Sequence, residues 1–449
     1  MKWYGLNITY IVRFLLAVIL YAACALYAHA DTSPSAVSLT MEAAIEQAIQ
    51  TNLTTALAKA TDQEARGRVI ETASALLPQV IGSIGQERVF KTNLAAEGFS
   101  SNPLLPNTVI GPFNVFDSRL QFTQKLLDVQ SIWSTKSASA QARAAGLGVD
   151  LAQEDVASAA ALSYIEALRA QKAIHAAQAD LELAERLDAQ ANRRRDAGMA
   201  TGIDLTRAET RTAEARHALI IAKRDAVQAD IRLKRVVGLP FDAAIMLVER
   251  QDLKTAPEPQ DSLIARALQD RVEIHYVSEN TESAKSALVA AKAGFLPTVI
   301  AFGDYGWSGN LPEGSARTGS IGGRLVLPIF EGRRTVGQIR EAEGRLNAVE
   351  SQASDTRRQV EEDARLALET LKAELDEIGV AELRVQLAER EVGEAENRFG
   401  AGVGDNIQVV DAQTSLAQAR QVHTDAWARL ADAQANLALA VGHMKTFEF

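Results

Sequence analysis

The chain has 449 residues, of which 47% are hydrophobic and 23% are charged, and its 47 basic and 57 acidic side chains give a formal net charge of −10. An acidic balance of this size disfavours nucleic acid as a partner. The only cysteine, Cys24, lies in a segment predicted to be removed, which excludes disulfides and thiolate metal sites from the mature chain.

The N-terminus has the three parts of a secretory signal peptide. Lys2 and Arg13 supply positive charge, residues 14–26 are apolar, and Ala28-His29-Ala30 places small residues at the positions that signal peptidase reads. We therefore predict a signal peptide over residues 1–30.

The mature chain is expected to begin near Asp31. Lipidation of Cys24 is the alternative to this cut, and the bulky Tyr21 three residues upstream disfavours it. No later apolar run approaches the roughly 20 residues that a membrane-spanning helix needs. If the mature chain enters a membrane, we expect strands to carry it.

The mature chain repeats one pattern twice. Leu77-Pro78-Gln79-Val80 matches Leu296-Pro297-Thr298-Val299 at an offset of 219. Later segments match at offsets of 203 or 204, as Ala197-Gly198-Met199 does with Ala401-Gly402-Val403. The first copy therefore contains about 16 extra residues within 78–128, a segment rich in glycine and proline. The excess is interpreted as a longer hairpin loop.

Each copy is predicted to contain a helix, two strands, a very long helix, a glycine-containing turn and another helix. The helices are expected at 40–77, 129–199, 204–237, 261–296, 332–400 and 406–441, and the strands at 78–92, 113–127, 297–309 and 317–330. None of the helical segments contains an internal proline. The first repeat is expected to span 31–240, a linker 241–260, the second repeat 261–441 and a C-terminal tail 442–449.

The helix after each turn has coiled-coil periodicity. Leucine and alanine alternate at steps of three and four along 204–237, starting at Leu205, Ala208 and Thr212, and along 406–441, starting at Leu416 and Ala419. Alanine lets helix axes approach closely, which is typical of many helices packed side by side. A helix of about 70 residues is roughly 105 Å long, so two shorter helices end to end match it in length.

The strands have one apolar and one polar face. In the second strand Phe116, Leu120 and Phe122 alternate with Asp117, Arg119, Gln121 and Thr123, and in the fourth strand Ile321 and Leu325 alternate with Ser320 and Arg324. Two hairpins covering a soluble core explain this alternation equally well. Four strands, however, leave two open edges, and membrane barrels close from about eight strands. Three chains would supply twelve.

The duplicated turns resemble those of a known family. They read Arg195-Asp196-Ala197-Gly198 leading to Asp204, and Arg398-Phe399-Gly400-Ala401-Gly402 leading to Asp411. With the paired Leu-Pro strand starts, this duplication resembles the outer-membrane efflux protein family, the TolC-like outer membrane factors, over about 40–441. The resemblance implies a mainly α homotrimer with a shared 12-stranded β-barrel in the cell outer membrane and an α-barrel tunnel across the periplasm.

The resemblance also implies that the helix turns form the closed periplasmic tip. The turn residues expected to contact an adaptor are Gly198, Gly202, Gly402 and Gly404. Asp204 matches a tip aspartate that takes part in the closing bonds of the family, and Asp411 matches an acidic position that lines the entrance. Gly404 stands where the family has an arginine, so either the ionic latch is absent or Arg207 or Asp405 takes over part of it.

The candidate tip residues also have simpler interpretations. Asp204 could be a helix N-cap, and Asp411 could complement the helix dipole in a first turn. The run Arg193-Arg194-Arg195 is interpreted as a solvated helix face. His423 falls on an apolar seam and the histidines have no metal-ligand spacing, so a packed structural role is favoured.

No phosphate-binding loop or nucleophile motif is present, so we expect neither an enzyme nor a cofactor. The predicted function is a passive outer-membrane duct of a tripartite efflux or type I secretion system, with a periplasmic adaptor, an inner-membrane pump or ABC exporter, and outer-membrane lipid as partners. The alternatives are a periplasmic coiled-coil adaptor or a structural protein without a pore. An adaptor would have one central hairpin, so the duplication favours the channel. The cargo and the pump stay open.

Overall fold

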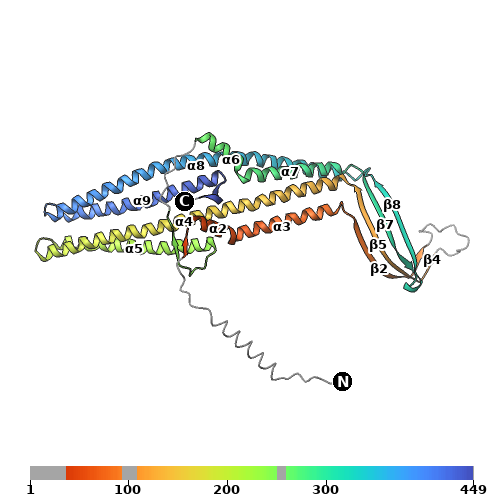
Figure 1. The fold of residues 1–449 in the computed structure, drawn as a ribbon, viewed down its shortest axis with the longest axis horizontal. Helices are drawn as coiled ribbons and strands as arrows, with labels where there is room; N and C mark the ends of the chain where they lie inside the picture. Colours follow the sequence, from red (N-terminus) through yellow and green to blue (C-terminus); the bar gives the residue numbers. More distant parts are fainter. Residues whose placement is uncertain (1–36, 94–108, 250–258, 448–449) are drawn as a thin grey trace, which may run out of the picture.

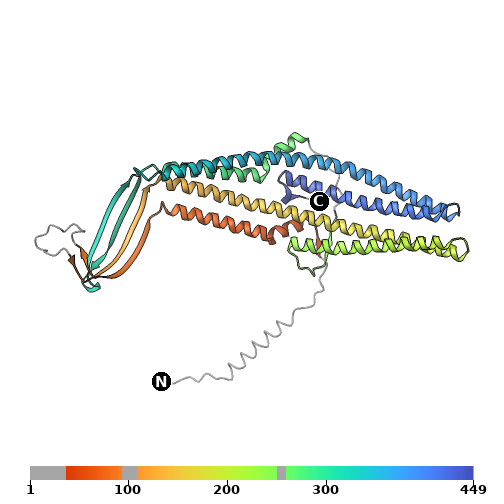
Figure 2. The same cartoon turned by 180° about the vertical axis from the view of Figure 1, so that it is seen from behind.

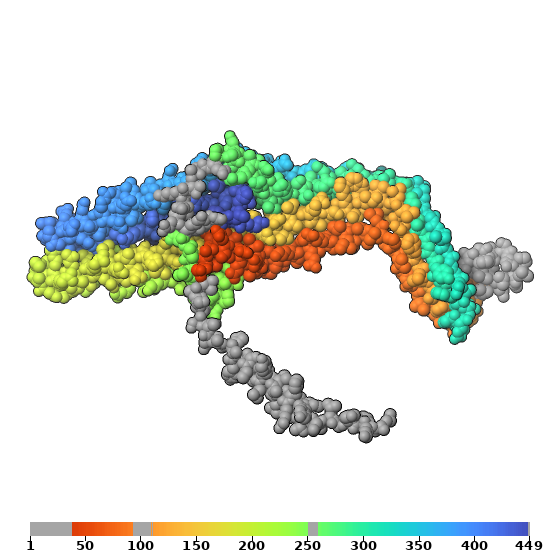
Figure 3. Space-filling view, in the orientation of Figure 1, coloured from red at the N-terminus to blue at the C-terminus, as the bar shows by residue number. Residues whose placement is uncertain are grey.

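The computed structural model describes residues 37–93, 109–249 and 259–447, which form one elongated body (Figure 1). A four-stranded sheet lies at one end and the turns of two helical hairpins lie at the other, an order that is also clear from behind (Figure 2). The space-filling view shows a long, thin body in which the sheet is bent away from the helices (Figure 3). The prediction of a mainly helical chain with a small β part is confirmed.

The two halves of the chain share one order of main elements: a short strand, two helices, two sheet strands, a long helix and a final helix. The first half contains β1 (Val37–Leu39), α2 (Met41–Thr51), α3 (Leu53–Ser74), β2 (Gln79–Val89), β3 (Thr92–Asn93), β4 (Val109–Ile110), β5 (Phe113–Leu127), α4 (Val129–Asp196) and α5 (Gly202–Val237). The second half contains β6 (Ile245–Leu247), α6 (Gln260–Asp270), α7 (Val272–Ala293), β7 (Thr298–Gly309), the 3-10 turn η1 (Pro312–Gly314), β8 (Ala316–Val326), α8 (Arg334–Gly400), α9 (Asn406–Ala440) and the 3-10 turn η2 (Met444–Thr446). The predicted signal peptide and Cys24 lie outside the described residues.

Two predicted helices, 40–77 and 261–296, are each broken into two, so their prediction as continuous helices is wrong. The breaks fall at Asn52 and Arg271, whose backbones are extended, and each break separates a helix of 11 residues from one of 22. Asn52 Oδ1 accepts a hydrogen bond from Thr54 N at 2.9 Å, which caps the second helix. The absence of proline was insufficient grounds for continuity, because asparagine favours the N-cap conformation.

At each break, the C-terminal end of another helix from the same half of the chain packs against the backbone. Gly238, with φ +77°, follows α5, and a Cβ on it would lie 2.4 Å from Thr51 Oγ1. Thr51 Oγ1 in turn donates a hydrogen bond to Val237 O at 2.9 Å. Gly442, also with φ +77°, follows α9, and a Cβ there would lie 3.3 Å from Arg271 Cα. Both helix ends therefore need glycine.

The predicted linker 241–260 contains a strand. Its β6 pairs in parallel with β1, and both strands lie against α4 through Tyr164, whose side chain is fully buried. The Tyr164 hydroxyl lies 2.7 Å from Leu39 O and 2.9 Å from Val248 O, and it accepts a hydrogen bond from Val248 N at 2.9 Å. The largest apolar cluster of the described residues surrounds this point, at mid-length.

The sheet has the order β2-β5-β7-β8, with every neighbouring pair antiparallel. Residue 79 lies 34 positions before residue 113, and residue 298 lies 18 positions before residue 316, so the first hairpin is 16 residues longer. This difference agrees with the longer loop that the sequence offsets predict. β8 ends at Val326 and not at residue 330, because Pro328 has no N–H to donate to a ladder.

The register of the sheet separates an apolar from a polar face. Residues directly opposite each other on neighbouring strands share a face. One face carries Val80, Ile84, Leu120, Phe122, Tyr305, Trp307, Ile321 and Leu325. The other carries Ser83, Asp117, Arg119, Gln121, Asp304, Ser320 and Arg324. The apolar side chains are mostly exposed in the single chain, up to 94% for Ile321.

The helices form one layer along the body (Figure 1). α3 and α5 lie end to end along α4, and α7 and α9 lie end to end along α8. α4 has 68 residues and is therefore about 100 Å long. None of the helices in the described ranges is both long and apolar enough to cross a membrane.

Replacing Tyr164 by phenylalanine is expected to lower the free energy of unfolding by about 1–2 kcal/mol, because the buried hydroxyl group and its hydrogen bonds to Leu39 and Val248 are lost. Denaturant unfolding of the detergent-solubilised protein measures this change. Tyr305→Phe, at a residue that is 54% exposed, is the matched control and should unfold like the wild type. A free energy of unfolding of the Tyr164 variant equal to that of the wild type would contradict the role of the hydroxyl group in holding β1 and β6.

Candidate functional site: the paired helix turns

The two helix turns at the end of the body are tied to each other. The Arg194 guanidinium, on α4, donates a hydrogen bond to Phe399 O at the end of α8 and lies 4.3 Å from the centroid of the Phe399 ring. Asn406 Nδ2, at the start of α9, donates to Asp204 O on α5 at 2.7 Å. Residues from the two halves, about 200 positions apart in sequence, thus form one tip.

Glycine determines the shape of both turns. Gly198 has φ +69° and Gly402 has φ +76°, a left-handed conformation that ends a helix and favours glycine. Gly202 is the first residue of α5, and a Cβ there would meet nothing within 4 Å. A Cβ on Gly404 would lie 3.0 Å from the backbone at Arg398 and Phe399. Position 404 is therefore a close backbone contact in this chain.

Asp204 is part of a capping box, and its prediction as the N-cap is wrong. Thr201 is the N-cap, and its Oγ1 accepts a hydrogen bond from Asp204 N at 3.3 Å. Asp204 Oδ2 accepts from Thr201 N at 2.9 Å and from Thr201 Oγ1 at 2.6 Å. These hydrogen bonds lower the pKa of the Asp204 carboxyl, and the charges of Arg207 and Arg194 lower it further.

Asp405 and Asp411 are exposed at the same end of the body. Asp405 is the N-cap residue of α9, but its side chain makes no capping hydrogen bond. Asp411 lies in the second turn of α9, not the first, and has no ion pair or hydrogen bond with any described residue. Both carboxylates therefore remain available to solvent or to another chain.

A buried polar layer, which no local sequence pattern predicts, lies behind the turns. Arg211, Gln413 and Asn406 are 6%, 0% and 0% exposed. Arg211 Nη2 donates to Gln413 O at 3.4 Å, and Gln413 Nε2 donates to Leu183 O at 3.4 Å. The Gln413 Oε1 and Arg211 Nε atoms have no partner among the described residues. Such a layer fixes the relative register of packed helices.

The burial of Arg211 corrects the predicted apolar seam. The seam assigned Thr212 to the interior, whereas Arg211 is the more buried of the two. A heptad pattern drifts by about 20° per seven residues against a straight helix, so adjacent positions can exchange places. Nearby, burial raises the pKa of the Asp180 carboxyl although Arg420 pairs with it at 2.7 Å.

The interpretation of Arg193-Arg194-Arg195 as a solvated face is wrong for its central member. Arg193 and Arg195 are exposed, whereas Arg194 is half-buried against Phe399. A helix turns 100° per residue, so consecutive arginines point in different directions and only one of the three faces α8. His423 is half-buried on α9, and within the described ranges no group of three metal-binding side chains is found.

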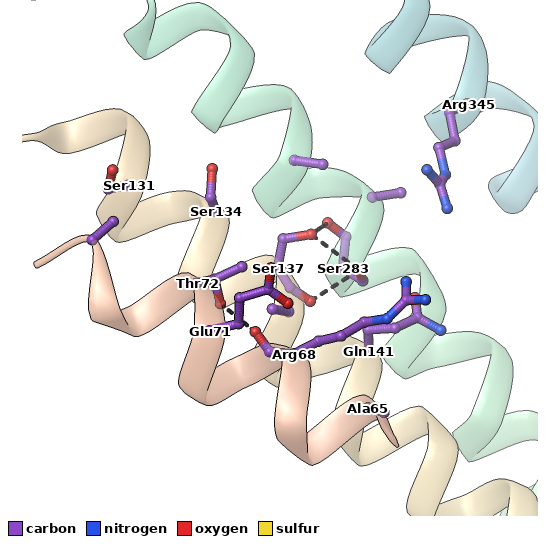
Figure 4. Close-up of a pocket in the computed structure, with 14 residues that line it drawn as sticks. Ala65, Arg68, Glu71, Thr72, Ser131, Ser134, Ser137, Gln141, Ser283 and Arg345 are labelled. Carbon is purple, nitrogen blue, oxygen red and sulfur yellow. Dashed lines mark hydrogen bonds between the residues drawn. The ribbon is translucent and has the colours of Figure 1, made fainter. Parts of the chain in front are cut away.

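A second polar surface lies next to the sheet (Figure 4). α3, α4, α7 and α8 line a groove of about 780 Å³ with small hydroxyl side chains and with Arg68 and Arg345. Ser137 Oγ donates to Ser283 O at 2.9 Å, and Ser283 Oγ donates to Ser137 O at 3.0 Å, which holds α4 and α7 close together.

Polar contacts link the groove to the polar face of the sheet. Lys125, at the end of β5, donates to Asp128 Oδ2 at 2.7 Å, and Ser131 Oγ donates to the same oxygen at 2.5 Å. Lys125 lies on the polar face and Ser131 lines the groove. The buried Asp128 thus connects the polar face of the strands to the groove between the helices.

Comparisons with known proteins give a consistent result. A family model described as "Outer membrane efflux protein" matches residues 44–239 and 263–443. The outer membrane protein TolC of Escherichia coli is 23% identical over 395 residues, covering 84% of this chain and 76% of TolC. The fold is similar to that of VceC from Vibrio cholerae, with a TM-score of 0.77 at 20% identity over 90% of this chain and 96% of VceC. It is also similar to CmeC from Campylobacter jejuni, with a TM-score of 0.79 at 18% identity over 91% and 86% of the two chains.

Replacing Arg194 by glutamine removes the charged hydrogen bond to Phe399 O and the contact with the ring, a loss of about 1–3 kcal/mol. We expect amide hydrogen exchange in the turn between α8 and α9 to accelerate by about fivefold or more. Arg193→Gln, one residue earlier and exposed, is the control and should leave exchange unchanged. Equal amide exchange rates in the two variants would contradict the proposed role of Arg194 in connecting the two turns.

The capping box predicts a pH dependence. The folded state lowers the pKa of Asp204 below its usual value of 3.8, so the stabilisation is complete above that value and is lost as the pH falls through the folded pKa. The free energy of unfolding of the wild type should exceed that of Asp204→Asn by about 0.3–1 kcal/mol near neutral pH, and this difference should disappear at strongly acidic pH. Asp411→Asn, measured by the same denaturant unfolding, should show no such trend.

Proposed function

Because the chain belongs to the outer membrane efflux protein family, we propose that three copies of it form one continuous export duct from the periplasm to the cell exterior. The family consists of passive outer-membrane channels, not enzymes, and the protein is a component of such a channel in the outer membrane. The proposal concerns the number of chains, the closure of the walls and the role of the tip.

The open edges of the single chain carry the trimer proposal. In the sheet, β2 and β8 each have one unpaired edge. In the helical layer, α3 and α5 form one border and α8 forms the other. The open strand β2 and the border helices α3 and α5 therefore lie on one side of the body, and the open strand β8 and the border helix α8 lie on the other. One type of contact, repeated three times, closes strands and helices together, and three chains supply twelve strands, enough for a barrel.

Small residues at heptad spacing mark both helical borders. Ala60, Gly67 and Ser74 on α3, and Gly337, Gly344 and Ser351 on α8, are all exposed in the single chain. A Cβ on Gly67, Gly337 or Gly344 would meet nothing within 4 Å. Glycine weakens a helix by roughly 0.5–1 kcal/mol relative to alanine, so its repetition at an open border suits the close approach of another helix.

The two faces of the sheet fit a barrel wall. The apolar face would contact lipid, and the T-shaped pair of Tyr305 and Trp307, with ring centroids 6.0 Å apart, belongs to it. The polar face would then line the duct, together with the groove between α3, α4, α7 and α8. This assignment places Arg68 and Arg345 in the wall of the tunnel.

The tip is proposed to be the periplasmic gate. Asp411 and Asp405 are exposed, and three copies of each around a narrow entrance would concentrate cations. Asp204 contributes through its capping box and not through a side chain directed at solvent. Because residue 404 is glycine, a latch at the tip would have to use other side chains, and Arg207 and the exposed Asp405 are the candidates.

The tip also offers equivalent apolar contacts for an adaptor. Met199 and Val403 are 68% and 72% exposed, and Ile203 and Ile407 are 64% and 40% exposed. The members of each pair are 204 positions apart, the offset of the two halves, so each chain presents two similar apolar tips. We propose that a periplasmic adaptor docks on them and that an inner-membrane pump or ABC exporter supplies the energy.

The mass of the protein, extracted from outer membranes in mild detergent, tests the assembly. A particle of three chains is the expected result. A monomer, or a protein recovered only from the soluble periplasmic fraction, would contradict the proposed duct.

Gly344→Leu is expected to abolish the three-chain particle, because a leucine at the border of α8 keeps the neighbouring helix at a distance. Leucine favours helix over glycine by about 0.8 kcal/mol, so a loss of trimer cannot be attributed to weakening of α8 itself. Gln338→Leu, on the same helix but on the groove face, is the control and should leave the trimer intact. A trimeric Gly344 variant would rule out this border as the contact.

A further inference from the structure

A charged network crosses the polar face of the sheet. Arg119, on β5, donates from Nε to Asp117 Oδ2 at 2.6 Å and from Nη1 to Asp304 Oδ2, on β7, at 3.1 Å. Ser320 Oγ, on β8, donates to Asp304 Oδ1. One guanidinium thus lies between two carboxylates, and the network connects three of the four strands.

The backbone around the network leaves room for these side chains. Gly85 lies opposite Asp117, and Gly306 lies opposite Arg119. A Cβ on Gly306 would lie 2.1 Å from Ser118 O, so only glycine fits there. The side chains of Arg119, Asp117 and Asp304 are 26%, 34% and 22% exposed, which shows that their neighbours already hold them in place in the single chain.

The charges of this network do not cancel. Each chain contributes two carboxylates and one guanidinium, an excess of one negative charge. The other charged groups on the same face add little to it: Lys125 is paired with Asp128, and Glu87 and Arg324 lie at opposite ends of the face and have opposite signs. Arg324 lies 5.1 Å from the centroid of the Phe302 ring.

We propose that Asp117, Arg119 and Asp304 form a selectivity belt inside the strand section of the duct, at which three copies present a fixed excess of three negative charges. The inference rests on the proposed trimer, whose apolar face points to lipid. A ring of like charge with low-dielectric walls focuses the field, attracts cations and retards anions. The belt is separate from the tip acids, at the opposite end of the body. Cationic solutes are therefore the class of cargo that the belt favours.

Single-channel recording in planar bilayers under a potassium chloride gradient tests the belt. Arg119→Gln removes the positive charge of the belt, so the permeability ratio of potassium to chloride should rise by about twofold or more. Asp304→Asn removes the excess negative charge and leaves the Arg119–Asp117 pair, so the ratio should fall by about twofold or more. Arg317→Gln is the control, because Arg317 lies on the apolar face, opposite Trp307.

The outcomes separate the belt from the duct. Opposite shifts for Arg119→Gln and Asp304→Asn, with no shift for Arg317→Gln, support the belt. If all variants form conducting trimers with the same permeability ratio of potassium to chloride, the network has only a structural role. That result would overturn the inference and leave the proposed duct intact. A wild-type trimer that conducts no ions would instead overturn the proposed duct. If Arg119→Gln does not assemble, the direction of the Asp304→Asn shift alone decides.

Discussion

The length of α4 and α8 is the constraint on which the rest of the fold depends. These two helices, of 68 and 67 residues, are the only described elements that run from the sheet to the helix turns. Ten of the eighteen buried residues of α4 are alanine, so neighbouring axes can approach closely on both sides. The shorter helices, the sheet and the mid-length strands are all positioned by packing against this pair.

Much of this architecture could be predicted from the sequence, because it depends on periodicities. The offsets of 219 and 204 located the longer hairpin, and the alternation in β5 and β8 agrees with the two faces of the sheet. Helix breaks were harder to predict. Asn52 has a local N-cap preference, but Arg271 is an ordinary residue within a helical pattern, and the contacts of Gly238 with Thr51 and of Gly442 with Arg271 at these breaks join parts of the chain far apart in sequence.

The candidate site was predicted less completely for a related reason. The turn glycines follow from local backbone preferences, so Gly198 and Gly402 could be located. The partners of Arg194, Arg211 and Gln413 lie about 200 residues away in sequence, and no local pattern distinguishes a buried polar residue from its solvated neighbour. For the acids Asp405 and Asp411 the structure adds exposure and location but no partner.

The breaks at Asn52 and Arg271 have a mechanical consequence. On either side of the mid-length docking points, the shorter helices are separate segments, so only α4 and α8 connect the two ends without interruption. α5 and α9 therefore have no continuous helical connection to α3 and α7, and a displacement of the helix turns would reach the strands only through α4 and α8.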